Sequence, residues 1–255
     1  MTADPAFIIE PIVIGSAAVV ALLLLLGLRL TRPSDPAARA RHQRILVAIA
    51  VALAAWFVVD FSLAQAGLFE PNTAGGPQGQ PRVPQIAIGI SLPLLIGLAF
   101  LLTSRRLNEV LARVPQAWII GVQFYRVVGG VFLYLYAYNM LPKEFALPAG
   151  IGDVLVGLAA LPVAYAVARG YAGSRGLVIA WNIAGIGDLV LAVATGFMSS
   201  PGLYQQLAFD APNTLIGAYP LVMIPLFAVP LSILLHVISL RRALANKVSQ
   251  GAAIV

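Results

Sequence analysis

Long apolar segments restrict the fold of this chain more than any other feature. Seven segments of 19 or more residues, each carrying few charges, follow one another along 255 residues. A bilayer core of about 30 Å is crossed by about 20 apolar residues in a helix, whereas strands and most buried core helices are shorter. We therefore expect an all-α membrane protein with seven transmembrane helices, at residues 7–30, 45–67, 86–104, 117–140, 147–168, 177–199 and 214–240.

The composition supports this interpretation. Hydrophobic residues make up 60% of the chain and charged residues only 10%, whereas soluble domains carry about 25% charged residues. The apolar segments leave no room for a separate soluble domain, so we interpret residues 1–255 as a single polytopic membrane domain in contact with the lipid bilayer. The absence of cysteine excludes disulfides, thiolate catalysis and thiolate metal sites.

The basic residues between the segments predict the orientation of the helices. The basic residues on one side of the expected topology are only Arg82 and Lys143, and five acidic residues lie there with them: Asp4, Glu10, Glu70, Glu144 and Asp210. Basic residues are enriched on the cytoplasmic side of membranes, so we expect the N-terminus outside and the C-terminus in the cytoplasm, in the cytoplasmic (inner) membrane. Fourteen arginines against two lysines are typical of a GC-rich bacterial source. The basic residues of the cytoplasmic side are Arg29, Arg32, Arg39, Arg41, Arg44, Arg105, Arg106, Arg113, Arg169, Arg175, Arg241, Arg242 and Lys247.

Several classes of function are excluded by the residues present. The net charge of +6 does not indicate nucleic acid, because the basic residues lie in short clusters beside apolar segments. The last segment has no lysine for retinal attachment, and the two histidines are too few for a bis-histidine haem among the spans or a three-histidine zinc site. His236 is interpreted as an interfacial residue near the cytoplasmic end. We predict no metal site and no cofactor, and the sequence indicates no oligomeric state.

Four ionisable residues lie well inside the apolar segments: Asp60, Arg126, Asp153 and Asp188. A charge at the bilayer centre costs roughly 2.5–3.5 kcal/mol on insertion scales, so such residues are candidates for function. At about 1.5 Å per helical residue, all four fall in the middle and outer half of the membrane, and we expect one polar cluster there. The candidate substrate- or ion-binding residues are Asp60, Gln123, Arg126, Asp153, Asn182 and Asp188, and none is assigned a catalytic role.

Helical spacing favours inward-facing positions for these residues. Small residues share a face with three of the four charges, Arg126, Asp153 and Asp188, which lets neighbouring helices approach closely. The shared faces are Gln123, Arg126 and Gly130 in the fourth segment, Gly150, Asp153 and Gly157 in the fifth, and Trp181, Gly185, Asp188, Ala192 and Thr195 in the sixth.

The charge balance of the expected cluster gives a mechanistic lead. Three aspartates face one arginine, and carboxylates close together cannot all remain charged. A proton or a cation is therefore expected in the site. The leading interpretation is a small-solute or ion transporter or a receptor-like module, with Arg126 as counter-ion or anion anchor and Asp153 and Asp188 as proton or cation carriers. The alternatives are an intramembrane enzyme using two aspartates and a non-catalytic subunit or scaffold whose polar residues hold helices together.

The fifth and sixth segments share the pentapeptide Ala-Gly-Ile-Gly-Asp, at 149–153 and 184–188. Two such glycine-flanked aspartates on antiparallel helices match a device of transporters with inverted repeats. The string Gly-x-Gly-Asp also resembles the motif of intramembrane aspartyl proteases, which implies that Asp153 or Asp188 would be catalytic, with the other or Asp60 as partner. Val59 stands where presenilin-like enzymes have tyrosine, and their Pro-Ala-Leu element is missing from the last segment, so we assign no family.

Two further features concern the ends of the segments. The connection 68–85, rich in proline and glycine, is expected to be an irregular loop on the outer side, with a lid over the site as the alternative. Pro220, Pro225 and Pro230 are expected to bend the last helix, as a hinge or passively.

Overall fold

The computed structural model describes residues 5–70 and 85–251, and all regular secondary structure within these two ranges is helical. Seven helices are long and apolar enough to cross a membrane, which confirms the expected number. Most of the outer connection expected to be a loop or lid, residues 71–84, lies outside the described residues.

Five spans are single helices: α1 (Pro5–Leu30), α2 (Pro36–Gln65), α3 (Gln85–Thr103), α7 (Lys143–Ala168) and α8 (Ser174–Ser199). The fourth span has three parts, α5 (Gln116–Val122), the 3-10 helix η1 (Gln123–Gly129) and α6 (Gly130–Ala137). The last span starts with a π-helical turn, η3 (Ile224–Ala228), and continues as α9 (Val229–Gly251). Two short elements complete the chain, α4 (Arg105–Arg113) between α3 and α5, and the 3-10 turn η2 (Leu215–Gly217).

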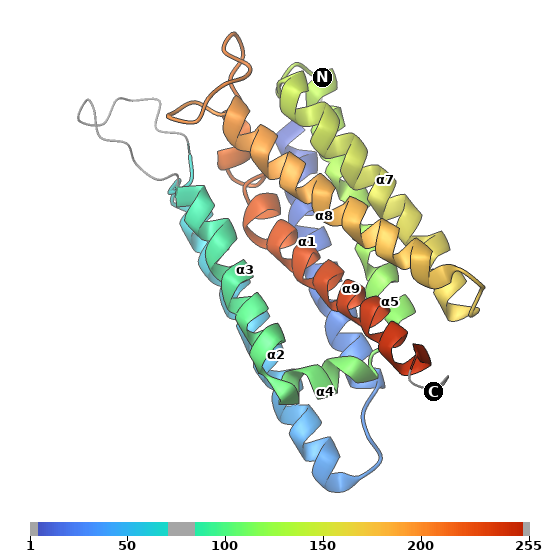
Figure 1. The fold of residues 1–255 in the computed structure, drawn as a ribbon. Coiled ribbons are helices and arrows are strands. Elements are labelled where there is room, and N and C mark those ends of the chain that lie inside the picture. The colour runs from blue at the N-terminus through green and yellow to red at the C-terminus, as the bar shows by residue number, and fades with distance from the viewer. Residues whose placement is uncertain (1–4, 71–84, 252–255) are drawn as a thin grey trace.

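The connections alternate between two ends of the bundle (Figure 1). The α1–α2 link, α4, the α7–α8 link and the C-terminal part of α9 lie at one end, which we call the Arg-rich end because it carries the basic connections. The last span, η3 with the first part of α9, is the most enclosed of the seven, with 56% of its most apolar stretch buried, compared with 6% for α2. α9 packs against α3, α5 and α8, and α7 packs against α8 and all three parts of the fourth span. The polar site lies where these elements meet.

The second span begins nine residues earlier than expected, at Pro36. Asp35 caps the helix, its side chain accepting a hydrogen bond from the Ala38 amide at 2.7 Å, and proline suits the first helical turn because its missing amide hydrogen is not needed there. The arginines of the first connection from Arg39 onward therefore lie on the first turns of α2 and not in a loop.

The last span begins ten residues later than expected, at Ile224. Pro220 and Pro225 lack an amide hydrogen, so a regular α-helix does not extend back through them, and the segment before Ile224 forms the 3-10 turn η2 and irregular turns. Pro225 lies in η3 and Pro230 in the first turn of α9. Pro220 therefore precedes the span, and only Pro225 and Pro230 lie within it, both among its first seven residues. That they bend the helix stays a prediction.

The fourth span changes helix type midway, which the sequence did not indicate. Residues 123–129 form a 3-10 helix, which has three residues per turn instead of 3.6. The sequence where η1 ends and α6 begins is Val127-Val128-Gly129-Gly130. β-Branched residues and glycine both have low α-helix propensity. This segment carries the arginine at the centre of the site.

Candidate functional site

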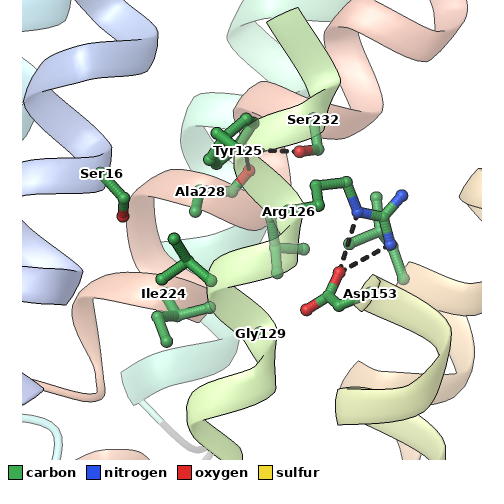
Figure 2. A pocket seen from close by; sticks show the side chains of 11 residues that line it. Ser16, Tyr125, Arg126, Gly129, Asp153, Ile224, Ala228 and Ser232 are labelled. Carbon is green, nitrogen blue, oxygen red and sulfur yellow. Dashed lines mark hydrogen bonds and ion pairs between the residues drawn. The ribbon is translucent and has the colours of Figure 1, made fainter. Parts of the chain in front are cut away.

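Arg126 lies at the centre of the bundle on η1, and its side chain is 2% exposed. Its Nε and Nη2 lie 2.8 and 2.7 Å from Oδ1 of Asp153 on α7. Nη2 also donates a hydrogen bond to Oδ2 of Asp188 on α8. Three of the four ionisable residues singled out in the apolar segments therefore meet, and one guanidinium joins three spans. Figure 2 shows the contacts between Arg126 and Asp153.

The third guanidinium nitrogen, Nη1, also has a partner for each of its hydrogens. Nη1 of Arg126 donates to the Gly185 carbonyl oxygen at 3.3 Å and contacts Nε2 of His236 at 3.1 Å. A guanidinium has five N–H groups, and five partner contacts are formed. Arg126 has no donor left for a bound anion, so the geometry fits a counter-ion and gives no support to the expected anion anchor.

His236 belongs to this site, so its interpretation as an interfacial residue is wrong. Its side chain is completely buried, and its Nδ1 lies 2.9 Å from Oδ1 of Asn182. The Asn182 amide nitrogen donates to the Val178 carbonyl and to Ser239, which leaves its oxygen to accept from His236. Because Arg126 only donates, the contacts fix the histidine with its hydrogen on Nδ1 and a lone pair on Nε2.

Gln123 reaches the site through a second group of polar residues. Its amide nitrogen donates to the Ser232 carbonyl at 3.0 Å, and its oxygen accepts from the Ser232 hydroxyl at 3.1 Å. The Tyr125 hydroxyl lies 2.5 Å from the same Ser232 hydroxyl and donates to the Ala228 carbonyl at 2.9 Å. Gln123 therefore binds the last span and contacts neither aspartate.

Sequence reasoning missed the polar residues that α9 contributes. Ser232, His236 and Ser239 are all buried and all hydrogen-bonded within the site. Their spacing of i, i+4 and i+7 places them on one face of a helix. This spacing is the sequence signal that could have identified them, because interfacial polar residues need not share one helix face.

Glycines make room for the charged side chains. A Cβ on Gly129 would overlap Asp153, one on Gly152 would overlap Oδ1 of Asp188, and one on Gly185 would overlap the His236 ring. Gly129, not the expected Gly130, shares a face with Gln123 and Arg126, because three residues per turn align positions i, i+3 and i+6. The expected packing of small residues against the charged side chains is therefore present, with Gly129 in the place of Gly130.

The two copies of the repeated pentapeptide have different surroundings. Gly152 lies against the Asp188 carboxylate, whereas no atom lies within 4 Å of the Cβ position of its counterpart Gly187. The copies match at their first glycine, since Gly150 and Gly185 are both closely packed, and at their aspartates, which both contact Arg126. They differ at the second glycine, so the correspondence between the two copies is partial.

A small cavity of about 30 Å³ lies beside Asp153. Its polar lining comes from Arg126, Asp153 and three hydroxyl groups, those of Ser16, Tyr125 and Ser232, and the rest of the lining is apolar or glycine. A water molecule needs roughly 10–15 Å³ of such volume, so the cavity has room for about two.

Asp60 does not join the cluster. It lies on α2, is 5% exposed, and its Oδ2 has no hydrogen-bond partner in the described part of the chain. No ion pair or hydrogen bond among residues 8–70 and 85–245 connects it to Arg126, Asp153 or Asp188. The expected four-residue cluster therefore has three of these members, with His236 in addition.

Metal coordination finds no match in the described residues, where no group of three or more His, Asp or Glu side chains lies close enough to hold a metal ion. The cluster offers two carboxylates, which are groups that can take up and release a proton, and one guanidinium holds both of them.

The chain belongs to the family described as "Domain of unknown function (DUF8737)", whose family model matches residues 83–244, more than half of the sequence. The matched range runs from α3 into α9 and includes the complete Arg126 cluster, whereas α1, α2 and Asp60 precede it. No curated protein and no solved structure matches the chain.

Proposed function

We propose that this chain is a carrier of the cytoplasmic membrane that binds a proton or a monovalent cation at the Arg126 cluster and couples this binding to the movement of a small solute. The observation that carries the proposal is the charge balance of the cluster. Two carboxylates contact one guanidinium, so the cluster has one net negative charge when both are ionised. A protein interior penalises uncompensated charge, and a bound proton or cation would remove it.

The position of the cluster supports coupling to helix movement. Arg126 holds α7 through Asp153, α8 through Asp188 and the Gly185 carbonyl, and α9 through His236. A change of charge on either carboxylate would alter the attraction that holds these spans together. The 3-10 segment that carries Arg126 is a natural place for such a change, because 3-10 geometry within a helix often marks a hinge.

Of the alternatives, the two-aspartate enzyme has the weaker geometric support. Its dyad requires two carboxylates that share a proton directly. Here both aspartates contact Arg126, and Asp60 contacts neither of them in the described residues. The scaffold alternative is favoured by the complete pairing of the Arg126 donors, since a fully bonded polar cluster can simply hold helices together.

Thermal stability of the purified protein separates a working site from a structural one. The unfolding midpoint is measured across pH and with Na⁺, K⁺ and Li⁺ for the wild type, Asp153→Asn and Asp188→Asn. A ligand that binds only the folded state raises the midpoint by mass action. We expect a shift of the wild-type midpoint with pH or with one cation, and both variants should fold but lose this shift.

Asp210→Asn is the matched control, because Asp210 is exposed in the connection before the last span, away from the cluster. It should keep the wild-type response. If both cluster variants fail to fold and no ion or pH change shifts the wild-type midpoint, the cluster is structural and the proposal fails.

A further inference from the structure

We infer that the exchangeable ion at this site is a proton, and that Asp153 carries it in contact with water in the neighbouring cavity while Asp188 remains the fixed partner of Arg126. This inference rests on the proposed function and specifies its ion and its carrier residue. It is carried by the cavity, by the contacts of the two carboxylates and by the hydroxyl groups that line the cavity.

The cavity distinguishes the two carboxylates. Asp153 lines it and Asp188 does not. Oδ1 of Asp153 takes both contacts from Arg126, and none of the hydrogen bonds in the described residues involves Oδ2. Oδ2 lies against Gly129, which also lines the cavity, and Figure 2 shows this oxygen turned toward the ribbon there. Asp153 therefore has an oxygen available on the cavity side.

The second carboxylate has a different environment. Oδ2 of Asp188 accepts from Arg126, and Oδ1 lies against Gly152 where α7 and α8 touch. Gly152 does not line the cavity. A water molecule in the cavity can thus reach Asp153 without displacing any contact of Asp188.

The cavity suits water better than an alkali cation. Hard cations are typically held by about six oxygen ligands, and four side chains with oxygen atoms line this space, Ser16, Tyr125, Asp153 and Ser232. The remaining lining includes the Arg126 guanidinium, which repels a second cation at close range. A proton requires one carboxylate oxygen and one acceptor for the new O–H group.

The Tyr125 and Ser232 hydroxyls provide hydrogen-bonding groups that can reorganise. They have two hydrogens between them and form three contacts: with the Ala228 carbonyl, with the Gln123 oxygen and with each other. At most two of these contacts hold a hydrogen at one time. Their oxygens can therefore accept a hydrogen bond from cavity water when the arrangement changes.

No other titratable group facing Asp153 has a better position for the proton. The groups near Asp153 are Arg126 and Tyr125 on η1, Asp188 on α8, and His236 on α9, which reaches it through Arg126. His236 has both ring nitrogens in use, Nε2 with Arg126 and Nδ1 with Asn182. Binding then forms one O–H bond on Asp153: a cavity water breaks one O–H bond as it passes a proton to the carboxylate and regains a proton that comes from the aqueous phase, so no hydroxide remains. The net charge of the cluster becomes zero.

Infrared difference spectroscopy on the protein in phosphatidylcholine vesicles tests this assignment, because the C=O stretch of a protonated carboxylic acid is separate from the bands of carboxylate. We expect a band that appears as the pH is lowered. Asp153→Glu should shift the band, since a glutamic acid now carries the proton, and Asp188→Glu should leave it in place. Neutralising either aspartate with asparagine should abolish the band at neutral pH, because one carboxylate then balances Arg126.

A second readout keeps the test decisive if a glutamate variant does not fold. Ser16→Leu fills the cavity from α1 and should slow hydrogen–deuterium exchange of the band several-fold. Gly15→Leu is the matched control, because nothing lies within 4 Å of its Cβ position. It should exchange like the wild type.

The outcomes separate this inference from the proposed function. A band that shifts in Asp188→Glu and not in Asp153→Glu overturns the assignment, as does equal exchange in Ser16→Leu and Gly15→Leu. Absence of any pH-dependent band together with a cation-dependent unfolding midpoint overturns the proton and leaves the carrier proposal standing. If neither the band nor any ion-dependent midpoint is found, the carrier proposal fails as well.

Discussion

At the scale of single residues, Arg126 shows how a membrane bundle accommodates charge. An isolated arginine in a low-dielectric interior is strongly unfavourable. Here every donor of the guanidinium has an acceptor, and two of the acceptors are carboxylates. The same pairing makes each aspartate dependent on the arginine, because without it two negative charges would remain buried close to each other.

Removing the arginine should therefore be costly. We expect Arg126→Gln to lower the free energy of unfolding by about 3–5 kcal/mol, the range for breaking a buried ion pair from one side. Unfolding of the purified protein by denaturant or heat measures this loss. Arg106→Gln, on the exposed face of α4, is the control and should change stability little. Adding Asp153→Asn and Asp188→Asn to Arg126→Gln should recover part of the loss, and equal stability of the two single variants would contradict the prediction.

The charged members of the site were predictable from the sequence because a charge inside an apolar segment is conspicuous. Arg126, Asp153 and Asp188 were found in this way. Gln123 was found because it shares a helical face with Arg126, and Asn182 because it is a polar residue near Asp188 in an apolar segment. His236 was not, because a histidine near the end of a span is common at membrane interfaces, and the two serines of α9 were not, because serine carries no charge. Asp60 likewise lies inside an apolar segment, so the sequence placed it with the other charges, but in the folded chain it lies apart from the cluster.

At the scale of elements, the contact between α7 and α8 depends on which glycine faces which side chain. Gly152 on α7 receives the Asp188 carboxylate from α8, so the two helices approach closely at this level. Gly157 on α7 likewise faces η1, where a Cβ would lie 2.8 Å from the Val127 amide nitrogen. Small residues thus set the distance between the helices that hold the charges.

The repeated pentapeptide provides a matched pair of substitutions. Gly152→Ala should destabilise the protein by about 1–3 kcal/mol, because the added methyl group overlaps Oδ1 of Asp188 and overpacking costs that much. Gly187→Ala should be neutral or stabilising by about 0.5–1 kcal/mol, since it meets open space and alanine favours the helix. Unfolding midpoints under one condition compare them. Equal losses in both variants would show that the close contact does not exist.

Element boundaries were predictable only where the chain carries a local signal. The number of spans followed from the length of the apolar segments, and the early start of α2 was readable from the Asp35-Pro36 cap. The change to 3-10 geometry in the fourth span was not readable, since propensity does not distinguish a 3-10 from an α-helical segment of this composition. Because of this 3-10 segment, Gly129 and not Gly130 shares a face with Gln123 and Arg126.

At the scale of the whole molecule, the alternation of connections places the basic residues at one end of the bundle (Figure 1). The positive-inside rule then predicts that the Arg-rich end faces the cytoplasm.

The absence of cysteine makes this orientation directly measurable. A single cysteine replaces Ser34 in the α1–α2 link or Asp210 before the last span, both exposed. An impermeant maleimide added to intact cells should label Asp210→Cys and leave Ser34→Cys unlabelled until the membrane is opened. The reverse pattern would place the N-terminus in the cytoplasm and overturn the predicted orientation.

The most direct test of the central claim, that an ion enters the bundle and binds at the Arg126 cluster, is the charge displaced when its concentration is changed suddenly. Proteoliposomes adsorbed on a solid-supported membrane are exposed to a jump in pH or in Na⁺, which requires no knowledge of the solute. We expect the wild type and Asp210→Asn to give a transient current after a pH jump, and Asp153→Asn and Asp188→Asn to give none. If the wild-type current equals that of the two cluster variants or of protein-free liposomes, no ion reaches the cluster and the claim is contradicted.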